Sequence, residues 1–592
     1  MRTFLAFKLN DNIHEKQQLN NITNLKDYYE ETYLNYTLSS DYQFHKNLGA
    51  FILDDEASIL DFPSTIERET INILTFFPPL NYKDFSVNKE TAMLSISQAL
   101  LKDKLILNDL TAPLLFSIID KENDELNIYM DILGITRLYV LENEKGIFWS
   151  NRPSALHIFS GHKAKMDLNS WKSYAVAGWF MDEDSPFQNV YRVPLSTVIS
   201  VKADNKGNQK YQMESTGGIK NLINTSINQI ENPKVLVTSI LENLNNYIDL
   251  WNADIKVDIS GGKDSRVSAA SVLNSKAVNY SFRTINDIDE ELNISRELLS
   301  KVQNNSRIEL LDPELYIKEQ PDLIERVDRL LFEYDGDFST VMISSPIIET
   351  NDFNTLDSIK INGFGGEVGK GAYYSNERWI KKLELMGEDA AYYRLATHFV
   401  KIGCVPLESI NIMKKKLESI LEEGRKLNIK GLKLLDYFHF MERFRRWTPL
   451  SGQIHCYSPF INNRFIASAL TNEPTENMKA NMHNQIITAL VPEWEGIKFF
   501  KATPEQSKEK DHKKLRLWQT KDKKDIEKIL RNPILWNDVF LEEEVLDLWE
   551  KAIREGIPNF KETLFHRVAM RAKFNSHLER INKAIDSNYS KL

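Results

Sequence analysis

Residues 260–265, with the sequence Ser-Gly-Gly-Lys-Asp-Ser, combine side chains and spacing that favour phosphate binding. Residues 255–259 before them are apolar and β-branched, which is typical of a buried parallel strand, and a helical pattern follows over residues 264–273. The adjacent glycines let the backbone approach phosphate oxygens, and the N–H groups and positive dipole end of the new helix point at the same place. Ser265 adds a hydroxyl donor, and Asp264 is suited to the Mg²⁺ that accompanies a nucleotide.

This stretch is not a Walker A loop, because that motif needs a glycine at position 257 and the chain has Val257 there. It resembles the S-G-G-x-D-S pyrophosphate loop of the N-type ATP pyrophosphatases, which cleave ATP between its α and β phosphates. The resemblance predicts a set of nucleotide contacts in and just before the loop. They are Val257, Asp258, Ser260, Gly261, Gly262, Asp264 and Ser265.

A second strand-like run, residues 359–362, leads into a turn that has five glycines between positions 363 and 371. So many glycines disfavour a regular element and allow the backbone to approach a ligand closely. Asn362 and Gly363 begin this turn and are expected to contact the nucleotide. Glu367 is a hard oxygen donor of the kind that Mg²⁺ prefers.

Strand and helix patterns alternate in residues 211–592. We expect residues 277–282 to form a second parallel strand and residues 290–302 its helix. This alternation predicts a doubly wound α/β sheet that binds its ligands at the carboxyl ends of the strands, where Ser281 and Phe282 are expected to meet the adenine. The amphipathic pattern from about residue 520 to residue 592 predicts core helices.

Residues 1–210 are richer in strand patterns and predict a layered α+β domain. The expected strands cover residues 3–9, 50–53, 126–130, 137–141 and 146–150, and the expected helices cover residues 90–101 and 169–176. The polar, turn-rich segment 203–235 is expected to contain a hairpin turn and the link between the two domains. A helix over residues 235–248 then leads into the strand before the 260–265 loop.

The composition is that of an ordinary globular protein, with 42% hydrophobic and 27% charged residues in a 592-residue chain. A net charge of −10 argues against a general binder of nucleic acid or anionic membranes. Cys404 and Cys456 are the only cysteines, so no disulfide framework or cysteine metal site is expected. No apolar run approaches the roughly 20 residues that span a bilayer, and the first eight residues do not form a signal peptide. We expect a cytoplasmic protein.

Over nearly its full length the chain resembles the asparagine synthetases and their relatives, the β-lactam synthetases and lasso-peptide cyclases. Residues 131–156 resemble a region of the class II glutamine amidotransferase domain, and residues 187–194 resemble the end of that domain. The resemblance implies a glutaminase-like domain of the Ntn type over residues 1–210. An N-type ATP pyrophosphatase synthetase domain would follow over residues 211–592.

The same resemblance implies roles for acidic and hydroxyl side chains. In the family an acidic residue of the glycine-rich turn joins the loop aspartate in holding Mg²⁺, which implies Asp264 and Glu367 as the metal pair. Residues 333–340 resemble a stretch whose threonine, Thr340 here, touches pyrophosphate. Residues 438–446 resemble the helix that carries the acidic base in β-lactam synthetases, with Glu442 at the matching position. His439 lies one turn earlier on the same face and is the alternative base.

Residues 491–503 resemble the family segment whose lysine stabilises pyrophosphate and the charge that develops during amide formation. Lys501 fits the spacing within one residue, and Lys498 is the second candidate for this catalytic role.

Three departures from the family pattern narrow the expected chemistry. Glutaminases of this class use an N-terminal cysteine, whereas this chain has Arg2, which cannot act as a nucleophile, so we expect no glutamine hydrolysis. Phe364 stands where asparagine synthetases have glutamate and β-lactam synthetases have tyrosine, and a phenyl ring cannot move a proton. Met342 stands where the family has an arginine that contacts phosphate.

These features predict an ATP- and Mg²⁺-dependent synthetase that adenylates a carboxylate and joins it to an amine from a source other than glutamine. Macrolactam formation, as in lasso-peptide cyclases, is the first hypothesis, with a small-molecule or peptide substrate and a leader-peptide protease or precursor-binding protein as partner. The alternatives are an intermolecular ligase and a non-catalytic nucleotide-binding protein. A tRNA-modifying pyrophosphatase is disfavoured by the absence of Cys-x-x-Cys motifs and of a basic domain, and we expect neither nucleic acid nor a membrane as a partner.

Overall fold

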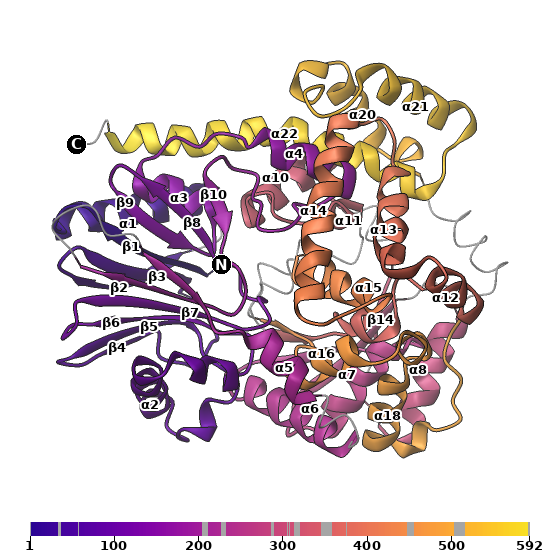
Figure 1. Ribbon diagram of the computed structural model, residues 1–592, viewed down its shortest axis with the longest axis horizontal. Coiled ribbons are helices and arrows are strands. Elements are labelled where there is room, and N and C mark those ends of the chain that lie inside the picture. Colours follow the sequence, from indigo (N-terminus) through magenta and orange to yellow (C-terminus); the bar gives the residue numbers. More distant parts are fainter. Residues whose placement is uncertain are drawn as a thin grey trace.

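The computed structural model describes residues 2–32, 37–56, 58–203, 211–226, 233–285, 289–304, 306, 308–312, 320–344, 358–374, 376–446, 455–501 and 516–589. Two antiparallel sheets form the amino-terminal half of the chain, and a parallel sheet surrounded by helices lies beside them (Figure 1). This arrangement confirms the mixed α/β class that the sequence predicts.

The first antiparallel sheet has the strand order β10-β8-β9-β1-β3-β2. Its strands are β1 (Thr3–Leu9), β2 (Leu38–His45), β3 (Leu48–Asp55), β8 (Tyr139–Asn143), β9 (Gly146–Ser150) and β10 (Val190–Arg192). The apolar sequence of β1 is buried on both faces because the second sheet packs on one face and helices α1 (Glu15–Thr32) and α3 (Pro153–Ser160) cover the other.

The second antiparallel sheet has the order β12-β11-β7-β6-β5-β4, with helix α2 (Lys89–Lys102) against its outer face. Its strands are β4 (Thr65–Glu67), β5 (Ile71–Phe77), β6 (Leu115–Asp120), β7 (Glu125–Met130), β11 (Thr197–Lys202) and β12 (Gln212–Ser215). The pairing of β12 with β11 carries this sheet past residue 210, where the sequence suggested that the first domain ends.

The parallel sheet has the order β15-β14-β13-β16-β17. Its strands are β13 (Asp254–Asp258), β14 (Tyr280–Ile285), β15 (Ile308–Leu311), β16 (Ser358–Ile361) and β17 (Cys456–Tyr457). Strands β14 and β15 are added on one side of β13, and β16 and β17 are added on its other side. The loops that follow β13 and β16 therefore begin next to each other, at the position where ligands bind in open α/β sheets.

Helices surround this sheet and connect the two halves of the molecule. They are α4 (Leu168–Ala177), α5 (Gly218–Ser226), α6 (Pro233–Ile248), α7 (Lys263–Leu273), α8 (Asp289–Lys301), α10 (Leu323–Tyr334), α11 (Val341–Ser344), α12 (Glu377–Glu384), α13 (Ala390–Val400), α14 (Leu407–Lys426), α15 (Lys433–Phe438), α16 (Asn463–Thr471), α17 (Pro474–Lys479), α18 (Asn481–Leu490), α20 (Asp522–Leu530), α21 (Glu542–Glu555) and α22 (Asn559–Tyr589). Helix α22 runs from the carboxy-terminal helices across to α1, α3 and α4 (Figure 1).

Two predicted strands are shifted in the structure. The strand expected over residues 137–141 is β8, Tyr139–Asn143, and the strand expected over residues 277–282 is β14, Tyr280–Ile285. In the second case pairing decides the boundary, because Tyr280 is opposite Ile255 at the beginning of β13. The Asn279 carbonyl still accepts from the Ile255 N–H at 3.1 Å, but the paired register begins at Tyr280.

Buried charges join the two halves. Asp337 follows α10 and lies among Arg192, Arg137 and Tyr139 of the amino-terminal half, with its Oδ2 2.8 Å from Arg192 Nη2 and 3.8 Å from Arg137 Nη1. The Asp337 side chain is 1% exposed. Burial alone raises the pKa of this carboxyl, but the two guanidinium groups outweigh that effect and lower it.

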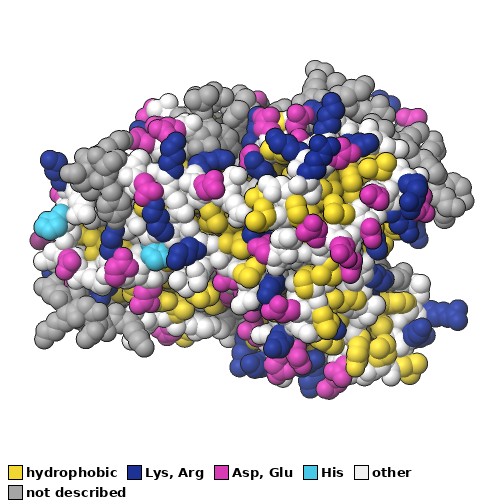
Figure 2. Space-filling view, turned by 90° about the horizontal axis from the view of Figure 1, so that it is seen from above, with side chains coloured by type: hydrophobic (Ala, Val, Ile, Leu, Met, Phe, Trp, Pro, Cys, Tyr) yellow, Lys and Arg dark blue, Asp and Glu magenta, His cyan; other side chains and the backbone are white. Residues whose placement is uncertain are grey.

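No helix within the described ranges combines the length and apolar character that crossing a bilayer requires. Seen from above, positive and negative side chains are interspersed over the surface (Figure 2). Among the described residues of that face, the basic side chains do not gather into one continuous area.

We predict that Asp337→Ala destabilises the protein by about 3–5 kcal/mol, because it leaves buried arginines without their carboxylate. Urea denaturation measures the change. Asp328→Ala is the matched control, since Asp328 forms a partly exposed pair with Lys573 at 2.9 Å and its loss should cost less than about 1 kcal/mol. Equal effects of the two substitutions would contradict this role for Asp337.

Candidate active site

The loop after β13 is closed by its own hydroxyl groups. Ser260 Oγ lies 2.6 Å from Ser265 Oγ and accepts a hydrogen bond from the Gly262 backbone N–H at 3.0 Å. Gly262 is the N-cap residue of α7. The first N–H groups of an 11-residue helix and two hydroxyls therefore meet at one point, which is the arrangement that binds phosphate.

Asp264, in the first turn of α7, lies among basic side chains from two other elements. Lys370, at the end of the short helix η4 (Gly366–Lys370), pairs with its Oδ2, and His483 of α18 lies 3.0 Å from its Oδ1. Burial alone raises the pKa of the Asp264 carboxyl, but His483 and Lys370 outweigh burial and lower it. Asp264 is thus a carboxylate at neutral pH.

The glycine-rich turn after β16 packs directly against Asp264. A Cβ atom at position 363 would lie 2.6 Å from Asp264 Cβ, and one at position 366 would lie 2.3 Å from Asp264 Oδ1. Only glycine allows this approach. Glu367 follows on the same turn, and burial together with the Asp264 charge raises the pKa of its carboxyl. The two predicted metal ligands are therefore electrostatic neighbours.

The donors present fit a Mg²⁺ ion that arrives with phosphates. Asp264 Oδ1 is buried and accepts no well-aligned hydrogen bond, although His483 Nε2 lies 3.0 Å away. Within the part of the chain that the structure describes, no group of three or more His, Cys, Asp or Glu side chains is arranged to hold a metal. Mg²⁺ commonly takes one or two carboxylates and completes its shell with phosphate oxygens and water, so Asp264 and Glu367 are a sufficient pair.

The segment that carries the candidate lysines docks on the same loop. The Phe500 backbone N–H donates to the Gly261 carbonyl at 2.9 Å, and a Cβ at position 261 would lie 2.3 Å from Phe500 Cβ. Lys501 comes immediately after this contact and is exposed. Lys498 lies on the surface, where it pairs with Glu290 of α8 at 2.7 Å. The geometry favours Lys501 over Lys498 as the residue near the loop.

His439 is buried at the beginning of a π-helical turn, η6 (His439–Phe444). Burial, followed by the charges of Arg443 and Lys370, lowers its pKa to about 3. His439 is therefore neutral near pH 7. The turn that it begins packs against η4, which carries Lys370. Such a low pKa makes it a weak base in this conformation.

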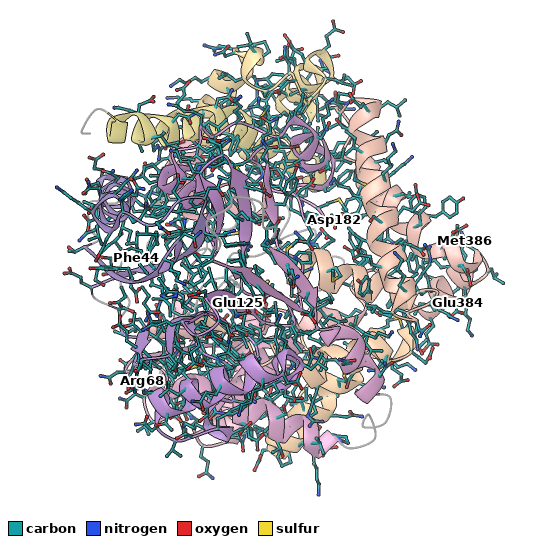
Figure 3. All side chains as sticks on the ribbon, turned by 60° about the vertical axis from the view of Figure 1, so that its left-hand side comes forward. Phe44, Arg68, Glu125, Asp182, Glu384 and Met386 are labelled. Carbon is teal, nitrogen blue, oxygen red and sulfur yellow. The ribbon has the colours of Figure 1, made fainter. Side chains whose placement is uncertain are left out.

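Glu442, the other candidate base, lies at the junction of the two halves. It accepts hydrogen bonds from Trp179 Nε1 at 3.0 Å and from the Asp182 backbone N–H at 3.2 Å, and it pairs with Arg446 at 3.3 Å. Asp182 lies where the amino-terminal sheets meet the carboxy-terminal helices (Figure 3). Burial raises the pKa of Glu442 to about 7 although Arg446 acts in the other direction. Because both oxygens are occupied, Glu442 positions Trp179 in this conformation.

Phe364 supports the glycine-rich turn through packing. Its ring stacks on Phe444 of η6, with centroids 5.4 Å apart and an interplanar angle of 3°. The Asn362 side chain accepts from the Phe364 N–H at 3.1 Å, and Ser458 Oγ donates to its carbonyl at 2.6 Å. Asn362 is thus part of the scaffold of the turn.

Three predicted contacts lie on other elements than the loop. Ser281 and Phe282 of β14 are opposite Lys256 and Val257 of β13, and Phe282 is fully buried. The carboxyl end of β14 is instead at residues 283–285, because the strand is shifted. Thr340 packs against the residue that follows α4, since its N–H donates to the Gly178 carbonyl at 3.1 Å.

The sequence did not reveal Lys370 and His483. Lys370 is three residues after Glu367 in the same glycine-rich turn, and this short spacing could have indicated that it belongs to the site. His483 lies more than 200 residues after Asp264, in a helix without any motif, and only the tertiary structure brings them together.

Arg2 links the two amino-terminal sheets. Its guanidinium donates to the Thr75 carbonyl of β5 at 3.1 Å, lies 3.5 Å from Asp54 of β3 and packs over the Phe76 ring. Burial lowers the pKa of this side chain. Arg2 thus has a structural role. In the glutaminases that the sequence resembles, the corresponding position carries the nucleophile.

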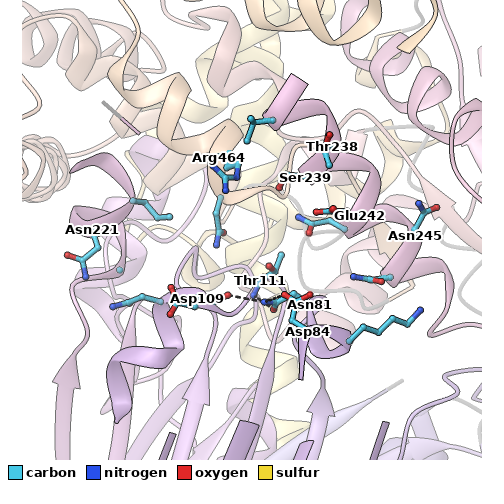
Figure 4. A pocket seen from close by; sticks show the side chains of 18 of the residues that line it. Asn81, Asp84, Asp109, Thr111, Asn221, Thr238, Ser239, Glu242, Asn245 and Arg464 are labelled. Atoms are coloured by element: carbon cyan, nitrogen blue, oxygen red, sulfur yellow. Dashed lines mark hydrogen bonds between the residues drawn. The ribbon is translucent and has the colours of Figure 1, made fainter. Parts of the chain in front are cut away.

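A cavity of about 880 Å³ lies between the amino-terminal half and helices α5 and α6 (Figure 4). Polar side chains line it, including Asn81, Asn221, Glu242 and Arg464. None of the sequence-predicted site residues is among the described residues of its wall, so this cavity is separate from the site around Asp264.

A scan of protein-family models finds no match to this chain, and neither does a search of curated proteins. Among solved structures, the glutamine phosphoribosylpyrophosphate amidotransferase of B. subtilis, complexed with ADP and GMP, is a distant match. The identity is 9% and the TM-score is 0.23, over 48% of this chain and 65% of that chain. The match thus covers just under two thirds of that enzyme, and at this TM-score it carries no argument about function.

We predict that Gly366→Ala lowers the affinity for Mg·ATP at least tenfold, because the new methyl group would displace Asp264 or the turn. Isothermal titration calorimetry measures the affinity. Gly387→Ala is the control: it has positive φ and nothing within 4 Å of its Cβ, so it strains the backbone without touching the site. Unchanged affinity in Gly366→Ala would mean that the turn does not shape the nucleotide site.

Glu442 generates a prediction about pH. Because its pKa is raised in the folded state, its contribution to stability is present at acidic pH and is lost as the pH rises from about 4.5 to about 7. Glu442→Gln cannot ionise, so stability should fall less than in the wild type between pH 5 and pH 7.5, by a difference on the order of 2–3 kcal/mol. Denaturation midpoints at both pH values test this, and parallel declines would contradict it.

Proposed function

We propose that the protein is an ATP-dependent synthetase that adenylates a carboxylate and transfers the acyl group to an amine. One observation carries the proposal. The Ser-Gly-Gly-Lys-Asp-Ser loop and the glycine-rich turn follow neighbouring strands at the point where the strand order reverses, and they enclose Asp264. This geometry supports a pyrophosphate-binding site of the N-type ATP pyrophosphatase kind.

In the proposed reaction the loop N–H groups and the hydroxyls of Ser260 and Ser265 bind the β and γ phosphates of ATP. Asp264 and Glu367 would hold Mg²⁺, which neutralises phosphate charge. A carboxylate oxygen of the substrate attacks the α-phosphorus, the bond to the bridging oxygen breaks, and pyrophosphate leaves. Positioning and charge neutralisation supply the catalysis of such a step. Lys370 pairs with Asp264 in this structure. With Asp264 holding Mg²⁺, the Lys370 ammonium would be available to a phosphate oxygen.

In the second half-reaction an amine attacks the acyl carbon, the bond to AMP breaks, and the nitrogen loses a proton. Lys501 stabilises the oxyanion that forms. Its place next to the Phe500–Gly261 contact supports this role. A lysine placed where negative charge develops is worth on the order of 10²–10³ in rate.

The amine comes from the substrate itself or from a second molecule, because Arg2 holds a structural position and cannot release ammonia from glutamine. An amine within the same substrate gives a macrolactam, as in the lasso-peptide cyclases that the sequence resembles. The alternative is a nucleotide-binding protein without turnover. The pairing of Lys370 with Asp264 is the observation that favours it, since a lysine can replace the metal charge.

We predict that ATP–pyrophosphate exchange depends on a carboxylic acid and falls at least 100-fold in Asp264→Asn. A panel of amino acids, dicarboxylic acids and acidic peptides, with hydroxylamine to trap the acyl group, provides the assay. Lys501→Ala should reduce hydroxamate formation by about 10²–10³, whereas the surface variant Lys498→Ala should lose less than threefold.

Two outcomes would count against the proposal. Release of ADP and phosphate instead of AMP and pyrophosphate would show that the cleaved bond is a different one. ATP binding without exchange for any acid in the panel would favour the nucleotide-binding alternative. Loss of activity in Lys498→Ala but not in Lys501→Ala would reverse the assignment of the lysines.

A further inference from the structure

A second cavity, of about 320 Å³, lies among α4, α13, α22 and the π-helical turn η6. Helices α4 and α22 lie side by side at the top of Figure 1, and α13 also contacts α4. Its volume is in the range of small-molecule sites. None of the roles assigned so far uses this cavity except for Thr340, which is in its wall.

The cavity has a cationic wall. Arg443, Arg567, His398 and Lys401 line it, and none of the described lining residues is acidic. Arg567 is only 9% exposed, and its Nη1 donates to the carbonyls of residues 175 and 176 at the end of α4, at 2.9 and 2.7 Å. Its Nε is buried and makes no hydrogen bond. A buried guanidinium fixed by neutral carbonyls keeps a positive charge that only an incoming anion can neutralise.

The lowered pKa of His398 agrees with the positive charge of the surrounding side chains. Burial lowers its pKa to about 4, and the neighbouring cations Arg394, Arg443, Lys401 and Arg567 act in the same direction. His398 is therefore neutral near pH 7 and can donate or accept a hydrogen bond. An anion in the cavity would make its protonation easier.

Apolar surface forms the remaining wall. Trp179 and Phe399 pack edge to face with centroids 5.5 Å apart, and Phe560 lies at the rim, 49% exposed. Glu442 fixes Trp179 through its indole N–H, and Arg443 stacks over the Trp179 ring at 4.9 Å. A site for an inorganic anion would gain nothing from aromatic walls. An organic acid uses both the cations and the rings.

Close packing brings the polar groups of the cavity together. Gly178 ends α4 with a positive φ of 90°, and a Cβ there would lie 3.0 Å from both Arg567 Nη2 and Thr340 Oγ1. A hydroxyl and a guanidinium thus converge at one place in the wall. That pair suits a carboxylate.

The cavity borders the proposed adenylation site. The Tyr373 ring lies 5.8 Å from the His439 ring and 6.2 Å from the His398 ring. His439 begins η6, which packs against η4, the short helix that ends at Lys370. One aromatic side chain therefore separates the two sites.

We propose that this cavity binds an anionic group of the acyl substrate, and that the substrate is an organic acid whose charged group is attached to an apolar or aromatic body. The identification of the ligand as substrate rests on the proposed function. The presence of an organic-anion site does not.

The experiment uses 4-fluorophenylacetate as a probe and follows its ¹⁹F line width with the full-length protein, because this signal detects weak binding. The acid should broaden with a Kd on the order of 1 mM, whereas the neutral 4-fluorophenylacetamide should not. Lys401→Glu should weaken binding at least threefold, and Arg567→Gln at least tenfold. Lys415→Glu, an exposed change on α14 away from the cavity, should have no effect.

Equal broadening of acid and amide, or no broadening of either, would overturn the proposal. So would displacement of the probe by pyrophosphate at equal concentration, which would show a phosphate site, or an equal effect of Lys415→Glu, which would show diffuse attraction. Lys401→Glu keeps the test decisive if Arg567→Gln does not fold. Probe binding combined with a complete absence of ATP–pyrophosphate exchange would remove the proposed function and leave the organic-anion site in place.

Discussion

The enclosure of one carboxylate, Asp264, is the constraint on which the rest of the site depends. Glycine at positions 363 and 366 is needed because any side chain would strike Asp264. Lys370 and His483 come from separate elements and lower its pKa against the cost of burial. A buried carboxylate in the first turn of a helix favours cations, and in this structure the Lys370 ammonium pairs with it. In the proposed function a magnesium ion with its phosphates would take that place.

Buried polar contacts also join the two halves into one structure. The amino-terminal half contributes Trp179, Arg192 and the end of α4 to contacts with Glu442, Asp337 and Arg567. The Trp179–Glu442 contact holds the π-helical turn that begins at His439, and Trp179, the end of α4 and Arg567 line the cationic cavity. The amino-terminal half, whose position 2 is a buried arginine, thereby has a structural role in shaping the carboxy-terminal half.

The sequence predicted the elements with strong local signals and missed the contacts between distant elements. The 260–265 loop, β1 and β9 follow from glycine placement and continuous apolar runs, and the structure has them where they were expected. The shift of β14 arose because pairing with β13 sets its beginning, and no single-strand pattern contains that information. The place of His483 next to Asp264 and the cationic wall around Arg567 arise from tertiary packing alone. Glu442 was recognisable as special, but its partners on the other half were not.

The most direct test of the account is to ask whether Asp264 holds a metal ion that touches a nucleotide phosphate, as the proposed function requires. Mn²⁺ replaces Mg²⁺ in the presence of α,β-methylene-ATP, which cannot be cleaved between the α and β phosphates, and pulsed EPR measures the ³¹P coupling to the bound ion. The account predicts a strong coupling in the wild type and in the exposed control Asp389→Asn, and its loss in Asp264→Asn and Glu367→Gln. Retention of the full coupling in Asp264→Asn would contradict the central claim.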